Sequence, residues 1–378
     1  MDFGFSEEQE MLRSSARAFL EKEAPMTFVR RMMDDERGFT DQLWRQMAEL
    51  GWLGLVLPER HGGAGLSFVD LVVVLEEMGR AVLPGPFFST VVLGGVAIAD
   101  GGSEPQREEY LPRIARGDLR VTLAHLEPSG RWDADGIQLE ARPLGGELVL
   151  NGTKLFVPDG HVADLFVVAA RAPGSQGTAG LSLVLVEATT PGVRITPLKT
   201  MDQTRKLAEV VFDGVRVSSS AVLGAAGEGW TLLERIADRG KVGLCAEMCG
   251  GAQKVLEMSV EYAKVREQFG KPIGAFQAIQ HKCANMLVEV ESSKSITYYA
   301  AWAVANDVDE APLAAAMAKA YCSDAYRHVA GEGIQIHGGI GFTWEHDMHI
   351  YFKRAKSSEV TFGDATWNRE LVAQRIGL

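Results

Sequence analysis

Two short segments of the chain carry the residues best suited to bind a charged ligand. The first is Arg266-Glu-Gln-Phe-Gly-Lys-Pro-Ile-Gly-Ala-Phe-Gln277, and the second is Gln335-Ile-His-Gly-Gly-Ile-Gly341. An arginine guanidinium donates paired, charge-assisted hydrogen bonds to phosphate oxygens, and here it stands just before a Phe-Gly turn. Glycines let backbone N–H groups approach a ligand closely because they carry no side chain. The two segments together predict a site for a dinucleotide diphosphate.

The composition excludes several classes of partner. The chain has 378 residues, of which 46% are hydrophobic, and its net charge is −12 with a pI near 5.3. Nucleic acids and anionic membranes require a basic surface, so neither is expected as a partner. No apolar run approaches the length of a membrane span, and the start of the chain is acidic where a secretory signal would be basic. We therefore expect a cytoplasmic protein without a membrane span.

The cysteines and histidines do not form a metal-ligand pattern. The four cysteines include one i,i+4 pair, Cys245 and Cys249, and no second pair completes a zinc set. We interpret all four as buried free thiols. His346 and His349 have the spacing of one helical face, but no further ligand accompanies them. No metal site is predicted.

The periodicity of apolar residues changes twice along the chain. Residues 6–118 have helical spacing, with Ser6 and Gln9 placed to cap the first helix. From about residue 119 the chain has short β-branched runs, which predict strands at 148–157, 165–169, 181–186 and 208–217. Helical spacing returns near Trp230, with helices expected at 232–264, 276–306 and 312–330, the last with Pro312 in its first turn. The pattern predicts an α+β protein with domains at 1–118, 119–226 and 227–378.

This order of elements, together with the two segments above, resembles the acyl-CoA dehydrogenase family over nearly the full length of the chain. The resemblance implies a helical N-terminal domain, a β-barrel-like middle domain and a C-terminal four-helix bundle. It also implies FAD as cofactor, an acyl-CoA thioester as substrate of α,β-desaturation, and electron-transfer flavoprotein as electron acceptor.

In the family, residues of the two segments grip the adenosine diphosphate end of FAD across a dimer interface. The resemblance places this role on Arg266, Gln268, Phe269, Gly270, Phe276, Gln277, Gln335, Gly338 and Gly339.

The family's contacts to the flavin ring are altered in the middle domain. A Thr-Glu-Pro motif reads Leu126-Glu127-Pro128 here, and a Gly-x-Lys-x-Trp-Ile-(Ser/Thr)-Asn motif reads Gly152-Thr-Lys-Leu-Phe-Val-Pro-Asp159. Leu126 and Pro158 take the hydroxyl positions, and Phe156 replaces the indole. A buried flavin atom that loses a hydrogen bond loses about 1 kcal/mol. We therefore expect a weak flavin pocket, unless backbone N–H groups compensate.

The carboxylate that removes the α-proton is missing from both positions at which the family supplies it. Phe362 occupies the commoner position and Gly240 the alternative one. Asp364 lies two residues past the first position, and Asp238 lies two residues before the second. A displacement of two residues moves a carboxylate by several ångströms, which catalysis tolerates poorly. Asp364 therefore either serves as a displaced base or contacts the adenosine side of a cofactor.

These features resemble the base-less subunit of the heterotetrameric acyl-CoA dehydrogenases of sterol-degrading actinobacteria. That resemblance implies that this chain completes the FAD site of a second, base-bearing subunit, for a substrate that includes bulky or sterol-derived acyl chains. Two alternatives remain open. One is an active homotetramer, or a nitroalkane-oxidase-like enzyme, that uses Asp364 as its base. The other is a flavin-free scaffold that binds acyl-CoA.

Overall fold

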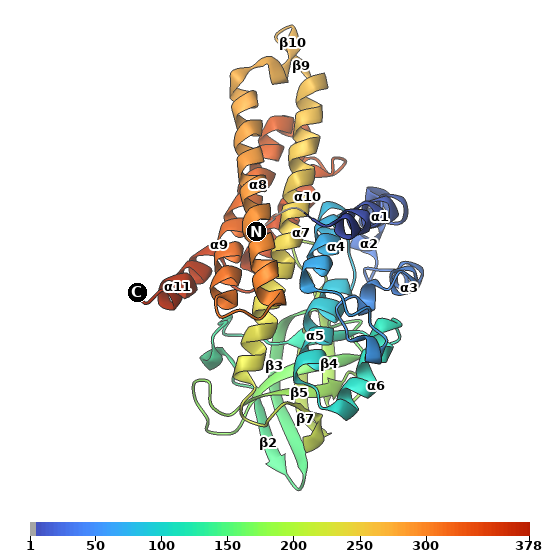
Figure 1. Ribbon diagram of the computed structural model, residues 1–378, viewed down its shortest axis with the longest axis vertical. Coiled ribbons are helices and arrows are strands. Elements are labelled where there is room, and N and C mark those ends of the chain that lie inside the picture. Colours follow the sequence, from blue (N-terminus) through green and yellow to red (C-terminus); the bar gives the residue numbers. More distant parts are fainter. Residues whose placement is uncertain (1–4) are drawn as a thin grey trace. The chain divides into compact units, whose positions relative to one another are not determined.

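The computed structural model describes residues 5–378, and contacts group them into two compact units (Figure 1). The helical unit comprises residues 5–31, Phe68–Leu83 and Lys241–Leu378. The sheet unit comprises Met32–Ser67 and Pro84–Gly240. Helices α2 and α7 contribute residues to both units. The three domain boundaries drawn from the sequence stay a prediction. Within residues 5–378 no helix is long and apolar enough to cross a membrane.

The helical unit opens with α1 (Glu7–Glu23), α2 (Met26–Asp34) and α4 (Phe68–Arg80). The predicted cap of α1 is confirmed: the Gln9 N–H donates to Ser6 Oγ, and the Ser6 N–H donates to Gln9 Oε1. Helix α4 is buried on every face between residues 71 and 79, including Glu76 and Glu77. The Glu77 carboxylate is paired with both Nε and Nη2 of Arg17, which compensates for its burial.

Five helices form the rest of the helical unit. They are α7 (Trp230–Val265), α8 (Gln277–Ala305), α9 (Ala311–His337), α10 (Met348–Val360) and α11 (Ala365–Arg375). Helix α9 packs against α8, α10 and α11. It begins with Pro312 in its first turn, as predicted, but runs seven residues past the expected end at residue 330. Gly333 lies in this extension, and a Cβ there would come within 2.6 Å of Val255 Cγ1. The close packing of α7 against this glycine explains why it does not end the helix.

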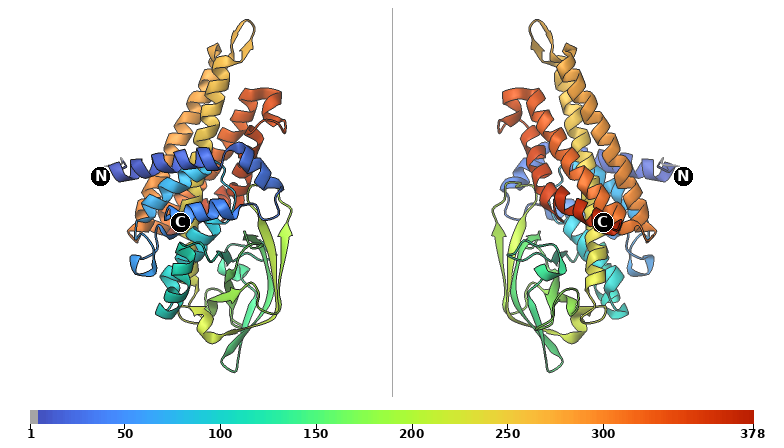
Figure 2. Two further views of the ribbon diagram at one scale, coloured as in Figure 1. Left: turned by 90° about the vertical axis from the view of Figure 1, so that its right-hand side faces the viewer. Right: turned by 90° about the vertical axis from the view of Figure 1, so that its left-hand side faces the viewer.

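The sheet unit is built on an eight-stranded sheet, seen from two sides in Figure 2. Its strands are β1 (Val121–Ala124), β2 (Glu140–Leu144), β3 (Glu147–Pro158), β4 (Leu165–Arg171), β5 (Leu181–Glu187), β6 (Val193–Leu198), β7 (Leu207–Ser218) and β8 (Val222–Leu223). Their order is β6-β7-β3-β2-β4-β5-β8, and β1 pairs with β4. All pairs are antiparallel except β2–β4 and β1–β4.

The four strands predicted from the sequence are β3, β4, β5 and β7, which supply most of the sheet's apolar core. Phe166 and Phe212 pack edge to face in that core, with ring centroids 6.3 Å apart. The remaining strands escaped prediction because β1 and β8 are very short, β2 contains charged residues and Pro143, and β6 is largely solvent-exposed.

Helices α3 (Asp41–Glu49), α5 (Val96–Gly101) and α6 (Glu104–Ala115) complete the sheet unit, with a π-helix, η3 (Phe88–Gly95), directly before α5. The 3-10 turns of this unit are η1 (Trp52–Gly54), η2 (Glu59–His61), η4 (Ala134–Gly136) and η5 (Ser219–Ala221). The predicted fold is confirmed: helices precede the sheet domain, and long helices follow it.

Candidate functional site

The Arg266 segment forms a hairpin that joins α7 to α8. Strand β9 (Glu267–Gln268) pairs with β10 (Lys271–Pro272), and Phe269-Gly270 forms the two-residue turn between them (Figure 1). Both turn residues have positive φ, 53° and 78°, as the favoured type of tight hairpin turn requires. Phe269 is 93% exposed, and its ring meets the edge of Phe276 with centroids 6.1 Å apart. The hairpin therefore brings together five predicted residues, namely Arg266, Gln268, Phe269, Gly270 and Phe276, and Gln277 follows directly as the first residue of α8.

The glycine cluster forms the turn after α9. Gly338 is the C-cap residue of that helix, with φ 64° and ψ −145°, a backbone conformation that is open essentially only to glycine. The turn continues as η7 (Gly338–Phe342). A Cβ added at Gly338 or Gly339 would meet nothing within 4 Å. The space beside these two glycines is open, and a ligand can approach their backbone there.

A stacked ring pair connects the hairpin with the glycine turn. The Tyr262 and His337 rings lie with centroids 4.4 Å apart and planes 23° from parallel. Tyr262 lies at the end of α7, where its carbonyl accepts a hydrogen bond of 2.9 Å from the Arg266 N–H. His337 directly precedes Gly338, and its Nδ1 donates to the Gly333 carbonyl over 2.7 Å. The two predicted segments are therefore neighbours within the helical unit.

The donor set of this site fits the diphosphate end of FAD. The Arg266 side chain is exposed, and its guanidinium makes no hydrogen bond or ion pair with any described residue. An uncompensated guanidinium beside open glycine backbone is suited to an anion. Gln335 is exposed on the last turn of α9, directly before the same glycines.

In the sheet unit, a buried ion pair joins the two segments expected to face the flavin. Lys154 Nζ lies 2.7 Å from Glu127 Oε1 and donates to the His125 carbonyl over 3.0 Å. The same Glu127 oxygen accepts the N–H groups of Gln138 and Leu139, each over 2.9 Å. Burial lowers the pKa of Lys154 to about 8, against the opposing effect of Glu127. These four contacts tie Lys154 and Glu127 to each other and to the backbone of the neighbouring segments.

The three side chains expected to face the flavin are apolar, unlike the buried ion pair from the same sequence motifs. Leu126 is half-buried and accepts the Leu155 N–H at its backbone carbonyl. Phe156 is half-exposed and adopts a positive φ of 54°, a strained conformation for an aromatic residue. Pro158 accepts a 2.6 Å hydrogen bond from Thr122 at its carbonyl. None of these three side chains has a hydrogen-bonding group to offer a flavin.

Both family positions for the base lack a carboxylate in the folded chain. Phe362 is buried, with an apolar ring and a positive φ of 59°. Gly240 is buried within α7 and has no side chain. Asp364 is exposed, and its Oδ1 accepts the Trp367 N–H over 2.8 Å, so that it caps α11. Asp238 is buried in α7.

The described part of the chain contains no cluster of metal ligands. His346 and His349 do not share a helical face, because His346 precedes α10 and its Nδ1 accepts the Met348 N–H. His349 instead stacks on Trp344. Three of the four thiols are buried as expected, but the expectation is wrong for Cys283, which is partly exposed where α8 emerges from the hairpin.

Sequence reasoning missed the residues that hold this site together. Tyr262 precedes the first quoted segment and His337 lies within the second, but no spacing rule indicates that their rings meet. Glu127 and Lys154 both stand in the family motifs, but no sequence signal shows that the lysine side chain is buried against the glutamate.

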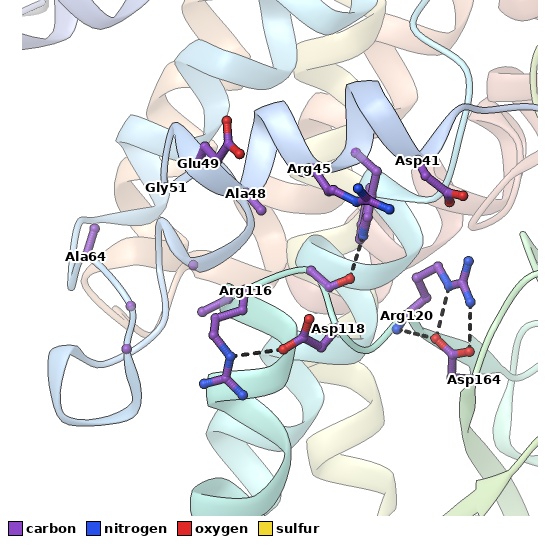
Figure 3. Close-up of a pocket in the computed structure, with 16 residues that line it drawn as sticks. Asp41, Arg45, Ala48, Glu49, Gly51, Ala64, Arg116, Asp118, Arg120 and Asp164 are labelled. Atoms are coloured by element: carbon purple, nitrogen blue, oxygen red, sulfur yellow. Dashed lines mark hydrogen bonds and ion pairs between the residues drawn. The ribbon is translucent and has the colours of Figure 1, made fainter.

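A polar hollow of about 880 Å³ lies in the sheet unit, and none of the predicted site residues lines it (Figure 3). Helix α3 lines one side with Asp41, Arg45 and Glu49, and Arg116 and Asp118 lie opposite. Its charges are largely compensated, because Arg116 pairs with Asp118, and the Arg120 guanidinium beside them makes two bonds to Asp164. Charge alone therefore selects no ligand for this hollow.

Comparison with known proteins identifies relatives over the full chain. The N-terminal, middle and C-terminal domains of the acyl-CoA dehydrogenase family match residues 6–118, 122–215 and 227–377. Acyl-CoA dehydrogenase IpdE2 of Mycolicibacterium smegmatis is 34% identical over 361 residues, which cover 95% of both chains.

Two similar solved structures are complexes by their names. A chain of the ChsE4–ChsE5 complex from Mycobacterium tuberculosis is 28% identical, with a TM-score of 0.91 and coverage of 100% of this chain and 99% of that chain. A variant of the Tcur3481–Tcur3483 steroid ACAD is 32% identical, with a TM-score of 0.87 and coverage of 98% of both. The resemblance drawn from the sequence is confirmed: the chain belongs to the acyl-CoA dehydrogenase family, whose members are FAD-dependent oxidoreductases acting on CH–CH donors.

Proposed function

We propose that this chain is a subunit of a heteromeric acyl-CoA dehydrogenase and completes a FAD site whose catalytic base lies on a second, related chain. The reaction is α,β-desaturation of an acyl-CoA thioester. One contrast carries the proposal. The Tyr262–His337 stack joins two nucleotide-binding segments, whereas Phe362 and Gly240 stand where a base is needed.

The nucleotide half of the site has its chemistry in place. The exposed Arg266 guanidinium would pair with the diphosphate, and the open backbone at Gly338 and Gly339 would let the cofactor approach closely. In the family this half serves the FAD of the neighbouring chain. The whole set proposed to bind the cofactor is Arg266, Gln268, Phe269, Gly270, Phe276, Gln277, Gln335, Gly338, Gly339 and Asp364.

The proton-abstracting half is missing from this chain. When bound, the flavin accepts a hydride from the β-carbon, but the weakly acidic α-proton still requires a positioned base. The Phe362 ring accepts no proton, and the Asp364 carboxylate is engaged at the start of α11. A partner that supplies the carboxylate explains how a chain with this sequence takes part in the reaction.

Exposed apolar side chains around the nucleotide half support a protein partner there. Phe269, Val288, Phe342 and Trp344 are 93%, 64%, 73% and 54% exposed in the single chain. Phe342 and Trp344 are two residues apart at the turn after α9, and exposed apolar groups that lie close together are characteristic of interaction surfaces. The names of the ChsE4–ChsE5 and Tcur3481–Tcur3483 complexes support a related but distinct chain as that partner.

We extend the proposal to the substrate and the electron acceptor. The steroid ACAD among the similar structures favours a bulky or sterol-derived acyl group, and the family favours electron-transfer flavoprotein as acceptor.

The test is to produce the chain alone and together with each acyl-CoA dehydrogenase-like chain encoded near it. We expect bound flavin and acyl-CoA oxidation only in a co-purifying complex, with one flavin for every two chains. A full flavin load and turnover by the lone chain would refute the proposal. Activity of the lone chain that disappears in Asp364→Asn, with flavin retained, would instead establish the homomeric enzyme. Stabilisation by CoA thioesters without flavin in any complex would establish the scaffold.

A further inference from the structure

A buried ammonium group holds the turn between α10 and α11. Lys319 lies on α9 with its side chain fully buried. Its Nζ donates to Ser323 Oγ over 2.8 Å and to the carbonyl oxygens of Glu359 and Gly363, each over 2.9 Å. All three ammonium hydrogens are therefore used, and two of them bond backbone near the end of α10 and in the turn.

A buried amide holds the same turn from its other side. Asn368 on α11 has no solvent exposure, and its Nδ2 faces the carbonyl oxygens of Phe362, Gly363 and Asp364 at 3.2, 3.0 and 2.9 Å. Three acceptors around one amide nitrogen fix the orientation of the group. Together, Lys319 and Asn368 bond four consecutive or nearby carbonyls of this short segment.

The backbone that these side chains hold is strained. Phe362 and Gly363 are consecutive residues with positive φ, 59° and 82°. Trp367 covers the turn so closely that a Cβ at Gly363 would lie 2.2 Å from its Cδ1. Strain in a non-glycine residue persists only where its surroundings determine the conformation, and such segments concentrate at ligand sites.

The turn ends at Asp364, whose carboxylate has one oxygen bonded within the chain and one that is not. Asp364 Oδ1 accepts the Trp367 N–H, whereas Oδ2 accepts no hydrogen bond from any described residue, and the side chain is exposed. A carboxylate oxygen repels a diphosphate but accepts hydrogen bonds from hydroxyl and amino groups. The adenosine end of FAD carries both, in its ribose hydroxyls and its adenine amine.

We propose that Lys319 and Asn368 are positioning residues for the cofactor site: they fix the Phe362–Gly363 turn so that Asp364 Oδ2 accepts a hydrogen bond from the adenosine end of FAD. Neither residue touches the cofactor, and both act through the turn. The inference rests on the proposed function, since it assigns the turn to a FAD that is shared with a partner chain. It assigns a role in cofactor binding to the turn at Phe362, the position where the family's catalytic base is absent.

Two measurements test the proposal with Lys319→Met, Asn368→Leu and Asp364→Ser. The first is amide hydrogen exchange of peptides covering residues 359–368 in the lone chain. The second is the FAD dissociation constant of the co-purified complex, from flavin fluorescence. Leu256→Ala in α7 is the control for general destabilisation, because its buried side chain is not part of the turn.

We expect Lys319→Met and Asn368→Leu to accelerate exchange in the turn and to raise the FAD dissociation constant severalfold, by no more than Asp364→Ser does, because both residues act through that one hydrogen bond. Asp364→Ser keeps a helix cap, so it should weaken FAD binding severalfold with little change in melting temperature. The control should leave exchange in the turn unchanged.

Two results overturn the inference while leaving the proposed function intact. One is an exchange rate in the turn that is unchanged in both Lys319→Met and Asn368→Leu. The other is FAD binding that weakens no more in these variants than in Leu256→Ala, while the complex of the unaltered chain still carries its expected flavin. A complex of the unaltered chain that takes up no flavin refutes the proposed function as well, and is recognised before any variant is made.

Discussion

The ring of Tyr262 stacks on the imidazole of His337, and this contact joins the last turn of α7 to the last residue of α9. Each ring belongs to a residue that is bonded or adjacent to a predicted ligand residue. Tyr262 accepts the Arg266 N–H at its carbonyl, and His337 precedes Gly338. The stack therefore links the backbone at Arg266 to the backbone at Gly338, two residues that we propose bind the cofactor.

This junction should weaken in acid. Burial is the main cause that lowers the pKa of His337, and the neighbouring His346 lowers it further. Because the folded-state pKa lies below the unfolded value, the neutral imidazole's contribution to stability is complete above about pH 6.5 and is lost as the pH falls through the folded pKa. His337→Phe keeps a stacking ring but does not titrate. We expect its unfolding free energy, relative to the unaltered chain, to improve by about 1 kcal/mol between pH 7.5 and 5, measured by urea unfolding. A pH-independent difference would contradict this.

The Arg266 guanidinium should matter to the cofactor and not to the fold. Its exposed side chain has no bonding partner among the described residues, so Arg266→Gln should leave the melting temperature within about 1–2 °C. Loss of a charged, paired contact of about 1.5–3 kcal/mol predicts FAD binding to the complex that is roughly 10- to 100-fold weaker. Lys264→Gln is the matched control, because it removes an exposed charge two residues away that pairs with Glu261. Equal effects of the two variants would show that only net charge matters.

The two adjacent glycines of the turn should respond differently to alanine. Both have open space around the missing Cβ, but only Gly338 has a positive φ, 64°. Gly338→Ala should therefore lower the unfolding free energy by about 1–3 kcal/mol, and Gly339→Ala by no more than about 0.5 kcal/mol. Chemical denaturation of both variants measures this directly. Similar costs at the two sites would mean that the turn relaxes.

Replacing only one partner of the buried Lys154–Glu127 pair should destabilise the fold. Lys154→Met leaves a buried carboxylate and should cost about 3–5 kcal/mol of stability. Adding Glu127→Gln should recover much of this, because the amide oxygen still accepts the N–H groups of Gln138 and Leu139. Adding Glu127→Leu instead should recover less, since both N–H groups lose their acceptor. Equal recovery by the two double variants, measured by thermal and urea unfolding, would show that these backbone bonds contribute little.

Local patterns in the sequence were sufficient to predict most of the secondary structure. The Ser6 cap, the tight turn at Phe269-Gly270 and the first-turn Pro312 follow from backbone chemistry within a few residues. The end of α9 did not, because the helix continues through Gly331 and Gly333, two poor helix formers directly after the expected end at residue 330.

The sequence suggests the ligand groups of the site but not the contacts that support them. Arg266 and the glycine cluster can be proposed from sequence alone, because a guanidinium and open glycine backbone suit an anion wherever they lie. The Tyr262–His337 stack, the Glu127–Lys154 pair and the hold of Lys319 on the turn at Phe362 each join residues far apart in the sequence, and only the folded chain brings them together.

The hairpin tip has a practical consequence. Phe269 lies in a tight turn with almost its whole ring in water, so the lone polypeptide exposes a large apolar side chain at the hairpin tip. Light scattering of chain produced by itself should reveal concentration-dependent self-association, and polar replacement at this one position should suppress it. Purification yield will then depend on whether a cognate companion is made in the same cell.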